Sequence, residues 1–176
     1  MNIFYLDHNQ KKAVSLMTNS HVVKMTLETA QLLSTAHRVL DGREAIFLSS
    51  KSKRKIWVHP DPHMEKTLYK ATHMNHPCAI WVRASLENYQ WLYRLFCELT
   101  NEYTLRYGKV HRCETLLKEI LKNPPRNIPG GNFFEPPLAM LEDYRKIGDS
   151  KSSYIQYYIS EKLKKENDIE RFYSRI

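Results

Sequence analysis

A histidine, a lysine and a glutamate occur at helical spacing within residues 20–28. Residues at i, i+3 and i+7 project from one face of a helix, so His21, Lys24 and Glu28 would point the same way. An imidazole, an amine and a carboxylate this close together can tune one another's proton affinities, as acid–base or amine-nucleophile chemistry requires. The alternative is the solvated side of a helix, in which Lys24 and Glu28 form an ordinary i, i+4 pair.

A second group of polar residues stands directly before another expected helix, in residues 72–77. A helix N-terminus presents unpaired N–H groups and a partial positive charge, and both favour a phosphate. We therefore expect His76 to line a binding site and Arg83, further along, to hold a phosphate. The alternative is that His76 simply caps the helix.

A third group is basic, because Lys51, Lys53, Arg54 and Lys55 lie just before Trp57. Lysine and arginine neutralise phosphates, and aromatic rings stack on bases or wedge between them. We expect these four cations to contact nucleic acid, although a run of charge is more commonly a solvated face. A basic, tyrosine-rich segment near the C-terminus offers the same combination.

Two pairs of histidines have spacings that can bind zinc: His59 with His63, and His73 with His76. Neither pair is accompanied by acidic or cysteine ligands in a recognisable pattern. Prolines also separate the first pair from regular structure. We therefore expect no metal and no other cofactor.

The composition favours a globular protein with a polyanionic partner. The chain has 176 residues and carries 27 basic against 19 acidic side chains, a formal charge of +8 that suits nucleic acid. Three cysteines without a CxxC motif predict reduced, mostly buried thiols. Because the sequence has no secretory signal and no apolar run of membrane-spanning length, we expect a cytoplasmic protein without a membrane partner.

Hydrophobic periodicity predicts a mainly α-helical fold in a single compact domain, residues 1–176. A short β-hairpin or ordered basic loop is expected near residues 45–58, and an irregular, proline-rich loop at residues 123–137. The apolar residues 3–6 are expected to be buried. The predicted helices cover residues 7–17, 20–41, a short piece ending near 70, 77–107, 114–122, 138–147 and 151–166.

In its pattern of residues the chain resembles the phage endonuclease V-type pyrimidine-dimer DNA glycosylases. In that family a helix opens with a histidine and places the catalytic glutamate seven residues later, and His21 and Glu28 keep this interval. A histidine-bearing segment, here residues 73–77, then leads into a long helix with an aromatic and leucine pattern. A tyrosine-rich C-terminal segment, here residues 154–158, has a counterpart too. The chain also resembles uncharacterised small proteins of large DNA phages and other DNA viruses.

The resemblance implies a compact helical fold that binds bent double-stranded DNA and a flipped-out nucleotide. In the family the N-terminal α-amine attacks the sugar carbon and forms an imine, while the glutamate aids sugar opening and elimination. By this resemblance Glu28 is the catalytic carboxylate and Met1 carries the nucleophilic amine.

Two residues depart from the family pattern. The family exposes a small residue after loss of the initiator methionine, whereas residue 2 here is Asn2, so we expect Met1 to be retained. The family's arginine before the glutamate is replaced by Leu27, and Lys24 is the nearest basic residue on that face. Three routes therefore stay open: attack by the N-terminal amine, attack by Lys24, or attack by water that Glu28 activates.

The sequence favours an enzyme that excises or modifies damaged or modified bases in double-stranded DNA, as an N-glycosylase with or without lyase activity. His21 and His76 would line its pocket. Two other classes stay open, namely a non-catalytic binder of nucleic acid or of a host protein, and an enzyme that acts on free nucleotides. The sequence does not indicate an oligomeric state.

Overall fold

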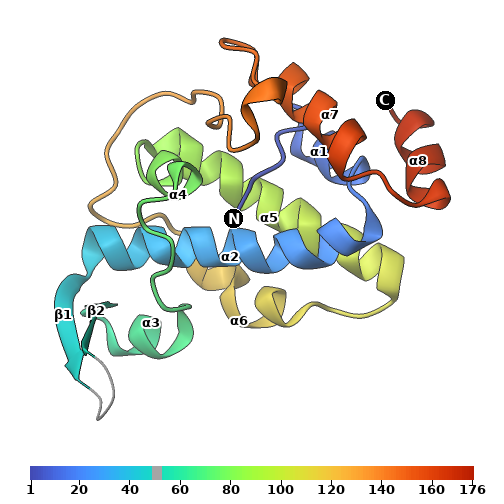
Figure 1. Cartoon of the computed structure of the whole chain (residues 1–176). Helices are drawn as coiled ribbons and strands as arrows, with labels where there is room; N and C mark the ends of the chain where they lie inside the picture. The colour runs from blue at the N-terminus through green and yellow to red at the C-terminus, as the bar shows by residue number, and fades with distance from the viewer. Residues whose placement is uncertain (49–52) are drawn as a thin grey trace.

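The computed structural model describes residues 1–48 and 53–176 and is mainly α-helical, as the sequence predicts (Figure 1). Its elements are α1 (Gln10–Ser15), α2 (Asn19–Asp41), β1 (Arg43–Leu48), β2 (Lys53–Val58), α3 (Pro62–Thr67), α4 (Pro77–Val82), α5 (Leu86–Tyr107), α6 (Arg112–Leu121), the 3-10 helix η1 (Glu142–Tyr144), α7 (Ser150–Glu161) and α8 (Glu166–Tyr173). None of the helices in the part of the chain that the structure describes could span a lipid bilayer.

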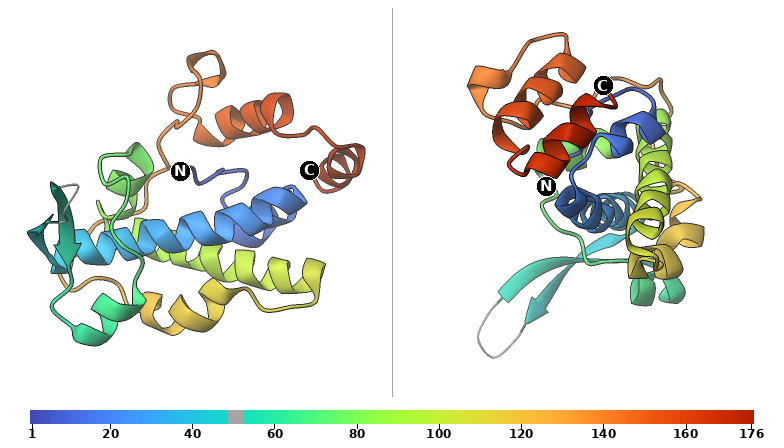
Figure 2. Two further views of the ribbon diagram at one scale, coloured as in Figure 1. Left: turned by 60° about the horizontal axis from the view of Figure 1, so that its bottom comes forward. Right: turned by 90° about the vertical axis from the view of Figure 1, so that its right-hand side faces the viewer.

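The two long helices α2 and α5 lie side by side at the centre of the fold (Figures 1 and 2). Both helices contribute fully buried leucines to the hydrophobic core, namely Leu32 and Leu33 of α2 and Leu92, Leu95 and Leu99 of α5. Burial of one such side chain contributes about 1.5–3 kcal/mol. Since α4 and α6 also contact α2, this helix is held on several sides and can position side chains precisely enough for chemistry.

The first residues form an arm that is buried against the helices, which confirms the expected apolar start. Residues 3–6 are at most 4% exposed. The Asn2 side chain holds the beginning of the arm, since its Oδ1 accepts hydrogen bonds from the N–H groups of Ile3 and Phe4 and its Nδ2 donates to the carbonyl of Ala139 at 2.8 Å. The N-terminus consequently lies next to the middle of α2 and near α4 (Figure 1).

Helix α2 carries three of the candidate residues, His21, Lys24 and Glu28, and both its ends are well defined. At its N-terminus Oγ1 of Thr18 accepts a hydrogen bond from the N–H of His21 at 3.2 Å, so the helix begins one residue before the predicted boundary. At its C-terminus Gly42 follows the last residue, as predicted. A Cβ atom at this position would collide with the carbonyl oxygens of Arg38 and Val58, so only glycine fits here without a shift.

The predicted hairpin is present and is formed by β1 and β2. The strands pair in an antiparallel register that runs from Arg43 opposite Val58 to Leu48 opposite Lys53. The hairpin projects away from the helical body (Figure 2). Lys51, which the sequence placed at its tip, lies outside the described residues.

A buried arginine ties the base of the hairpin to the helices. Arg38 of α2 is fully buried, and its guanidinium donates to the carbonyls of Trp57 and Leu68 at 2.9 and 3.0 Å. It also forms an ion pair with Glu65 of α3. Because a buried charge needs such partners, Arg38 fixes the end of α2, β2 and α3 relative to one another.

The predicted helix over residues 77–107 is wrong in one respect, because the structure divides it into α4 and α5. Ser85 causes the break: its Oγ accepts a hydrogen bond from the N–H of Asn88 at 3.1 Å and starts a new helix. The N–H of Leu86 is taken by the carbonyl of Pro129 at 2.8 Å, so it has no partner in the preceding helix.

The C-terminal third differs more from the prediction. Residues 138–147 contain only η1, where the guanidinium of Arg145 donates to the carbonyl of Met140 at 2.8 and 3.0 Å and stabilises a loop in place of a helix. The helix predicted over residues 151–166 ends at Glu161, and α8 was not predicted at all. In α7 the buried Tyr154 and Tyr158 both contact the ring of Phe4, which joins this helix to the N-terminal arm.

Candidate active site

Glu28 lies next to the N-terminus of the chain. The backbone N–H of Asn2 donates to Oε2 of Glu28 at 3.2 Å, and the ammonium of Lys24 lies 3.6 Å from Oε1. The Glu28 side chain is 16% exposed, whereas that of Lys24 is 62% exposed. The carboxylate is therefore held in a sheltered position between the first residues of the chain and a solvated lysine.

His76 faces the same region from the N-terminus of α4. It caps that helix, as the simpler of the two sequence interpretations proposed, because its Nδ1 accepts a hydrogen bond from the N–H of Cys78 at 3.2 Å. The pKa of His76 is lowered first by burial and then by the positive charges of the N-terminal amine and His73, while Glu28 opposes the shift. The N-terminal amine, Glu28 and His76 thus lie within electrostatic reach of one another.

Cys78 lies near the N-terminal amine and Glu28, but its thiol is unreactive. Burial raises the pKa of its thiol to about 12, and the nearby N-terminal amine opposes that shift only in part. A thiol that stays protonated is a poor nucleophile. Together with Cys97 and Cys113, Cys78 is a free cysteine, and Cys78 and Cys113 are buried as the sequence predicts.

His21 does not join Glu28 and turns to the aromatic side chains around the arm. Its ring stacks on Phe4 with the centroids 4.8 Å apart, and its Nδ1 lies 2.6 Å from the hydroxyl of Tyr158. The same hydroxyl oxygen accepts a hydrogen bond from the N–H of Thr18 at 2.9 Å, so Tyr158 connects His21 to the start of α2. Burial is the main cause that lowers the pKa of His21 to about 4, so the ring is neutral and anchors the arm.

Arg83 supports the segment that carries His76. Its Nη1 donates to the carbonyls of Met74 and Ala79 at 2.7 and 2.9 Å, so the guanidinium bridges the loop before α4 to the helix itself. The side chain is partly buried, and burial lowers its pKa. This placement holds the loop in position and leaves the guanidinium close to the segment that carries His76.

A family model described as pyrimidine dimer DNA glycosylase matches residues 1–115, which include the arm, α2, α4 and α5. The chain belongs to this family. Membership supports a DNA glycosylase function in DNA repair, with DNA as the molecule that is bound. No curated protein and no solved structure matches the chain significantly.

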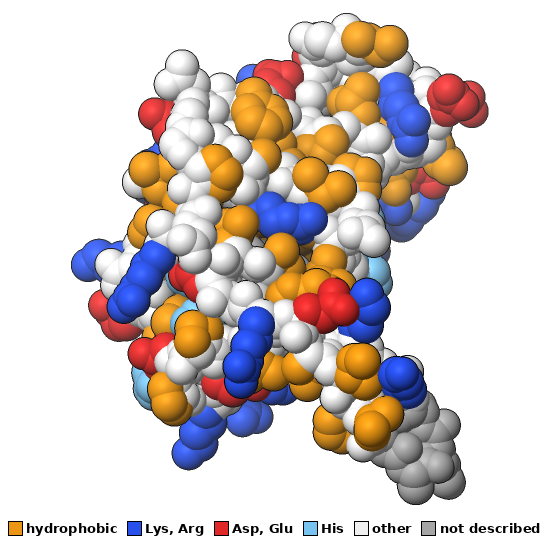
Figure 3. All heavy atoms as spheres, turned by 90° about the vertical axis from the view of Figure 1, so that its left-hand side faces the viewer, with side chains coloured by type: hydrophobic (Ala, Val, Ile, Leu, Met, Phe, Trp, Pro, Cys, Tyr) orange, Lys and Arg blue, Asp and Glu red, His pale blue; other side chains and the backbone are white. Residues whose placement is uncertain are grey.

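The hairpin gives this glycosylase an exposed surface that is both basic and apolar. Lys53, Arg54 and Lys55 are exposed on β2; Lys55 pairs with Glu44 at 2.9 Å, and Arg54 lies over the ring of Phe47, 5.1 Å from its centroid. Exposed apolar side chains of β1 lie opposite these cations in the register and alternate between the two faces of the hairpin, with exposed fractions of 44–71%. Figure 3 shows apolar side chains next to the grey atoms. The apolar set consists of Ile46, Phe47 and Leu48.

Sequence reasoning missed the contacts that hold the arm in place in this glycosylase. Phe4 has a positive φ of 51°, an unusual conformation for a bulky residue, which the Asn2 side chain and the contacts with His21 and Tyr158 stabilise. The apolar run at residues 3–6 indicated burial but not this bend. Tyr158 also lies beyond the part of the chain that the family model matches.

Proposed function

We propose that this glycosylase excises a damaged pyrimidine, of the pyrimidine-dimer class, from double-stranded DNA and then cleaves the strand as a lyase. The nucleophile is the N-terminal α-amine, and Glu28 is the catalytic carboxylate. The observation that supports this most is the hydrogen bond of 3.2 Å between the N–H of Asn2 and Oε2 of Glu28. It brings the start of the chain next to a sheltered carboxylate.

In the proposed reaction the neutral amine attacks C1′ of the flipped-out nucleotide, the bond from C1′ to the base breaks, and the base leaves with a proton. Opening of the sugar ring then breaks the C1′–O4′ bond and O4′ takes up a proton from solvent, while the nitrogen keeps its remaining proton, so that a cationic imine forms. Glu28 stabilises the cationic imine and assists the removal of a proton from C2′, after which the C3′–O bond breaks. Water then hydrolyses the imine and releases the amine.

Two amines other than that of Met1 compete for this role. If Met1 is removed, the α-amine becomes the Asn2 nitrogen, which already contacts Glu28. If Met1 is retained, the α-amine is that of Met1, one residue before the Asn2 nitrogen that contacts Glu28. The ammonium of Lys24 also reaches Glu28 at 3.6 Å, but its side chain is largely solvated. Because a nucleophile must be held in an attack geometry, the anchored arm is favoured over the exposed lysine.

His76 and Arg83 complete the proposed pocket. Because Nδ1 of His76 accepts from the helix, its neutral ring carries the proton on Nε2 and can donate a hydrogen bond to a phosphate or to the departing base. Arg83 holds the loop that positions His76 and adds positive charge near a bound phosphate. His21 does not contact the substrate in this proposal. It stacks on Phe4 and thereby positions the arm.

We propose that the hairpin is a DNA-binding element outside the catalytic pocket. Lys53, Arg54 and Lys55, with Lys51 beyond the described residues, contact backbone phosphates, and the apolar side chains of β1 lie against the opened groove. A protein that bends DNA to expose one nucleotide needs such contacts outside the pocket to offset the cost of deformation.

Release of base from ultraviolet-irradiated duplex DNA by Glu28→Gln and Lys24→Gln variants tests the proposal. In Glu28→Gln the amide oxygen can still accept the Asn2 N–H, so the fold and the DNA affinity are retained while turnover falls by about 10²–10⁴-fold. Lys24→Gln is the matched control and keeps turnover within a few-fold. Full activity of Glu28→Gln, or loss of activity in Lys24→Gln with DNA binding intact, contradicts the proposal.

A further inference from the structure

A second polar cluster lies at the C-terminal end of α2, away from Glu28. His37 follows Glu28 by nine positions on α2, and at about 1.5 Å per residue this places the two roughly 14 Å apart along the axis. An open cavity of about 850 Å³ lies here, between the end of α2, the start of α3 and the loop after α6. His37, Asp41 and His59 line it together with Glu119 and Asn123.

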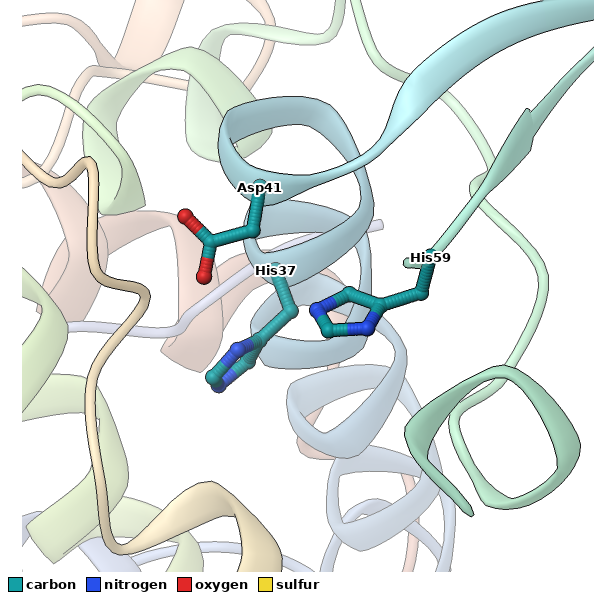
Figure 4. A group of neighbouring side chains, drawn as sticks. All are labelled: His37, Asp41 and His59. Carbon is teal, nitrogen blue, oxygen red and sulfur yellow. The ribbon is translucent and has the colours of Figure 1, made fainter. Parts of the chain in front are cut away.

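The three residues converge although they come from two segments of the chain. His37 and Asp41 are one turn apart on α2, and His59 follows directly after β2. One ligand atom from each lies within 4.8 Å of the others. Figure 4 shows the ring of His59 directed towards His37 and the carboxylate of Asp41.

Both histidines present a buried nitrogen that has no hydrogen-bond partner among the described residues. His37 is 2% exposed and His59 is 5% exposed, and the unpaired atoms are Nδ1 of His37 and Nε2 of His59. A buried polar atom without a partner costs about 1–3 kcal/mol, so two of them side by side require an explanation.

The hydrogen bonds around His37 leave a lone pair on its unpaired nitrogen. The hydroxyl of Tyr89 donates to the carbonyl of Leu121 at 2.9 Å, so its oxygen accepts from Nε2–H of His37 at 2.8 Å. The ring proton is therefore on Nε2, and Nδ1 is an acceptor that points into the cluster. Metal-bound histidines are held in this manner, with one ring nitrogen on the metal and the other donating to a protein oxygen.

Asp41 is fixed in the same way. Its Oδ2 and Oδ1 accept hydrogen bonds from the N–H groups of Arg126 and Asn127 at 2.8 and 2.9 Å. Each carboxylate oxygen keeps a second lone pair. His59 is held more loosely, since its Nδ1 accepts from the N–H of Asp61 at 3.1 Å.

We propose that His37, Asp41 and His59 bind one divalent transition-metal ion of the zinc class. Two imidazoles and a carboxylate are donors that Zn²⁺ takes, and the cavity leaves room for water as the fourth ligand. Zinc–ligand distances of about 2.0–2.2 Å place neighbouring ligand atoms about 3.4 Å apart, so the side chains close in on binding. Nε2 of His59 becomes the ligand, its proton moves to Nδ1, and the bond to the Asp61 N–H opens at the exposed start of α3.

Bound metal would join the end of α2 to the base of the hairpin, next to the contacts that Arg38 makes. The site is thus separate from the proposed function at Glu28. Its effect should be seen in stability, because a ligand that binds only the folded chain raises the free energy of unfolding by mass action.

Zinc and cobalt titrations of the chelator-treated full chain test the proposal, with binding measured by calorimetry and by the cobalt absorption spectrum, and stability by thermal melting. We expect one ion per chain and a higher Tm with zinc. His59→Gln should weaken binding by about 100-fold or more and abolish the rise in Tm. The matched control is His63→Gln, which removes an exposed histidine four residues away and should bind like the wild type.

His59→Cys keeps the proposal testable if His59→Gln fails to fold. A cysteine at this position restores a zinc ligand, and cobalt binding then adds a thiolate charge-transfer band that the wild type lacks. The proposal is overturned if the wild type binds no zinc at micromolar concentrations, or if His59→Gln binds zinc as tightly as the wild type. It is equally overturned if His59→Cys binds cobalt without the thiolate band.

Discussion

The backbone nitrogen of Asn2 lies 3.2 Å from Oε2 of Glu28, although 26 residues separate them in the chain. The contact depends on the buried arm, which the side chain of Asn2 and the ring of Phe4 hold against α2 and α7. The packing of the core therefore fixes the position of the N-terminus next to Glu28.

Truncation of Phe4 should therefore affect both stability and activity. Phe4→Ala removes the ring that stacks on His21 and contacts Tyr158, and a buried phenylalanine truncated to alanine costs about 3–5 kcal/mol. Urea denaturation measures the loss, and base release measures the displacement of the arm. Phe4→Leu is the control, since it retains most of the volume and should lose less on both counts. Equal stability of Phe4→Ala and the wild type would show that the arm is not anchored there.

A neutral buried histidine makes stability depend on pH. Burial lowers the pKa of His21 to about 4, and that of His37 likewise, whereas an unfolded histidine titrates near 6.5. Between these values the unfolded chain binds more protons than the folded chain, so the free energy of unfolding falls as the pH drops from about 6.5 to about 4. Denaturation of the metal-free chain across this range measures the slope. His21→Asn, which keeps a hydrogen-bonding group but does not titrate, should show a shallower slope; an unchanged slope would exclude His21 as a contributor.

If the hairpin binds backbone phosphates, its contribution to DNA affinity should depend on the salt concentration. Combined Lys53→Gln, Arg54→Gln and Lys55→Gln substitutions should weaken duplex binding and reduce the slope of log K against log salt by up to about 0.9 for each phosphate that is no longer neutralised. The control removes the same charge elsewhere, with Lys11→Gln, Lys109→Gln and Lys122→Gln on exposed residues. If both triple variants lose the same affinity for duplex DNA, the hairpin is not a specific DNA-binding element. An enzyme on free nucleotides would lose no activity in either.

Glycine at the end of α2 is required by space. In Gly42→Ala the new Cβ meets the carbonyl oxygens of Arg38 and Val58, so the junction between α2 and the hairpin must shift at a cost of about 1–3 kcal/mol. Gly130→Ala is the control, because its Cβ has open space. Chemical denaturation of the two variants compares them directly, and equal stabilities would contradict the close packing.

Elements with a local signal were predictable from the sequence. The periodicity and the glycine stop indicated α2, the apolar run indicated the buried arm, and the basic residues between two short apolar runs indicated the hairpin. The break before α5 was not predicted, because it depends on one Ser85 hydrogen bond and on the loop that passes near it.

The site was predictable only where its residues share a helix. The spacing of His21 and Glu28 identified α2, yet the two side chains face different neighbours, because the arm intervenes. Zinc pairs sought at short spacing, such as His59 with His63, led to the expectation of no metal. The cluster of His37 and His59 depends on the hairpin's return to the end of α2, and no local pattern encodes that contact.

Borohydride trapping on duplex DNA with a pyrimidine dimer, followed by mass mapping of the linked peptide, tests the proposed mechanism most directly. Reduction converts the imine into a stable bond between enzyme and sugar, and the mass of the N-terminal peptide reports whether Met1 or Asn2 carries it. We expect the adduct on that α-amine, and its loss in Glu28→Gln. An adduct on the peptide that contains Lys24, or base release with no trapped adduct at all, would contradict attack by the N-terminal amine.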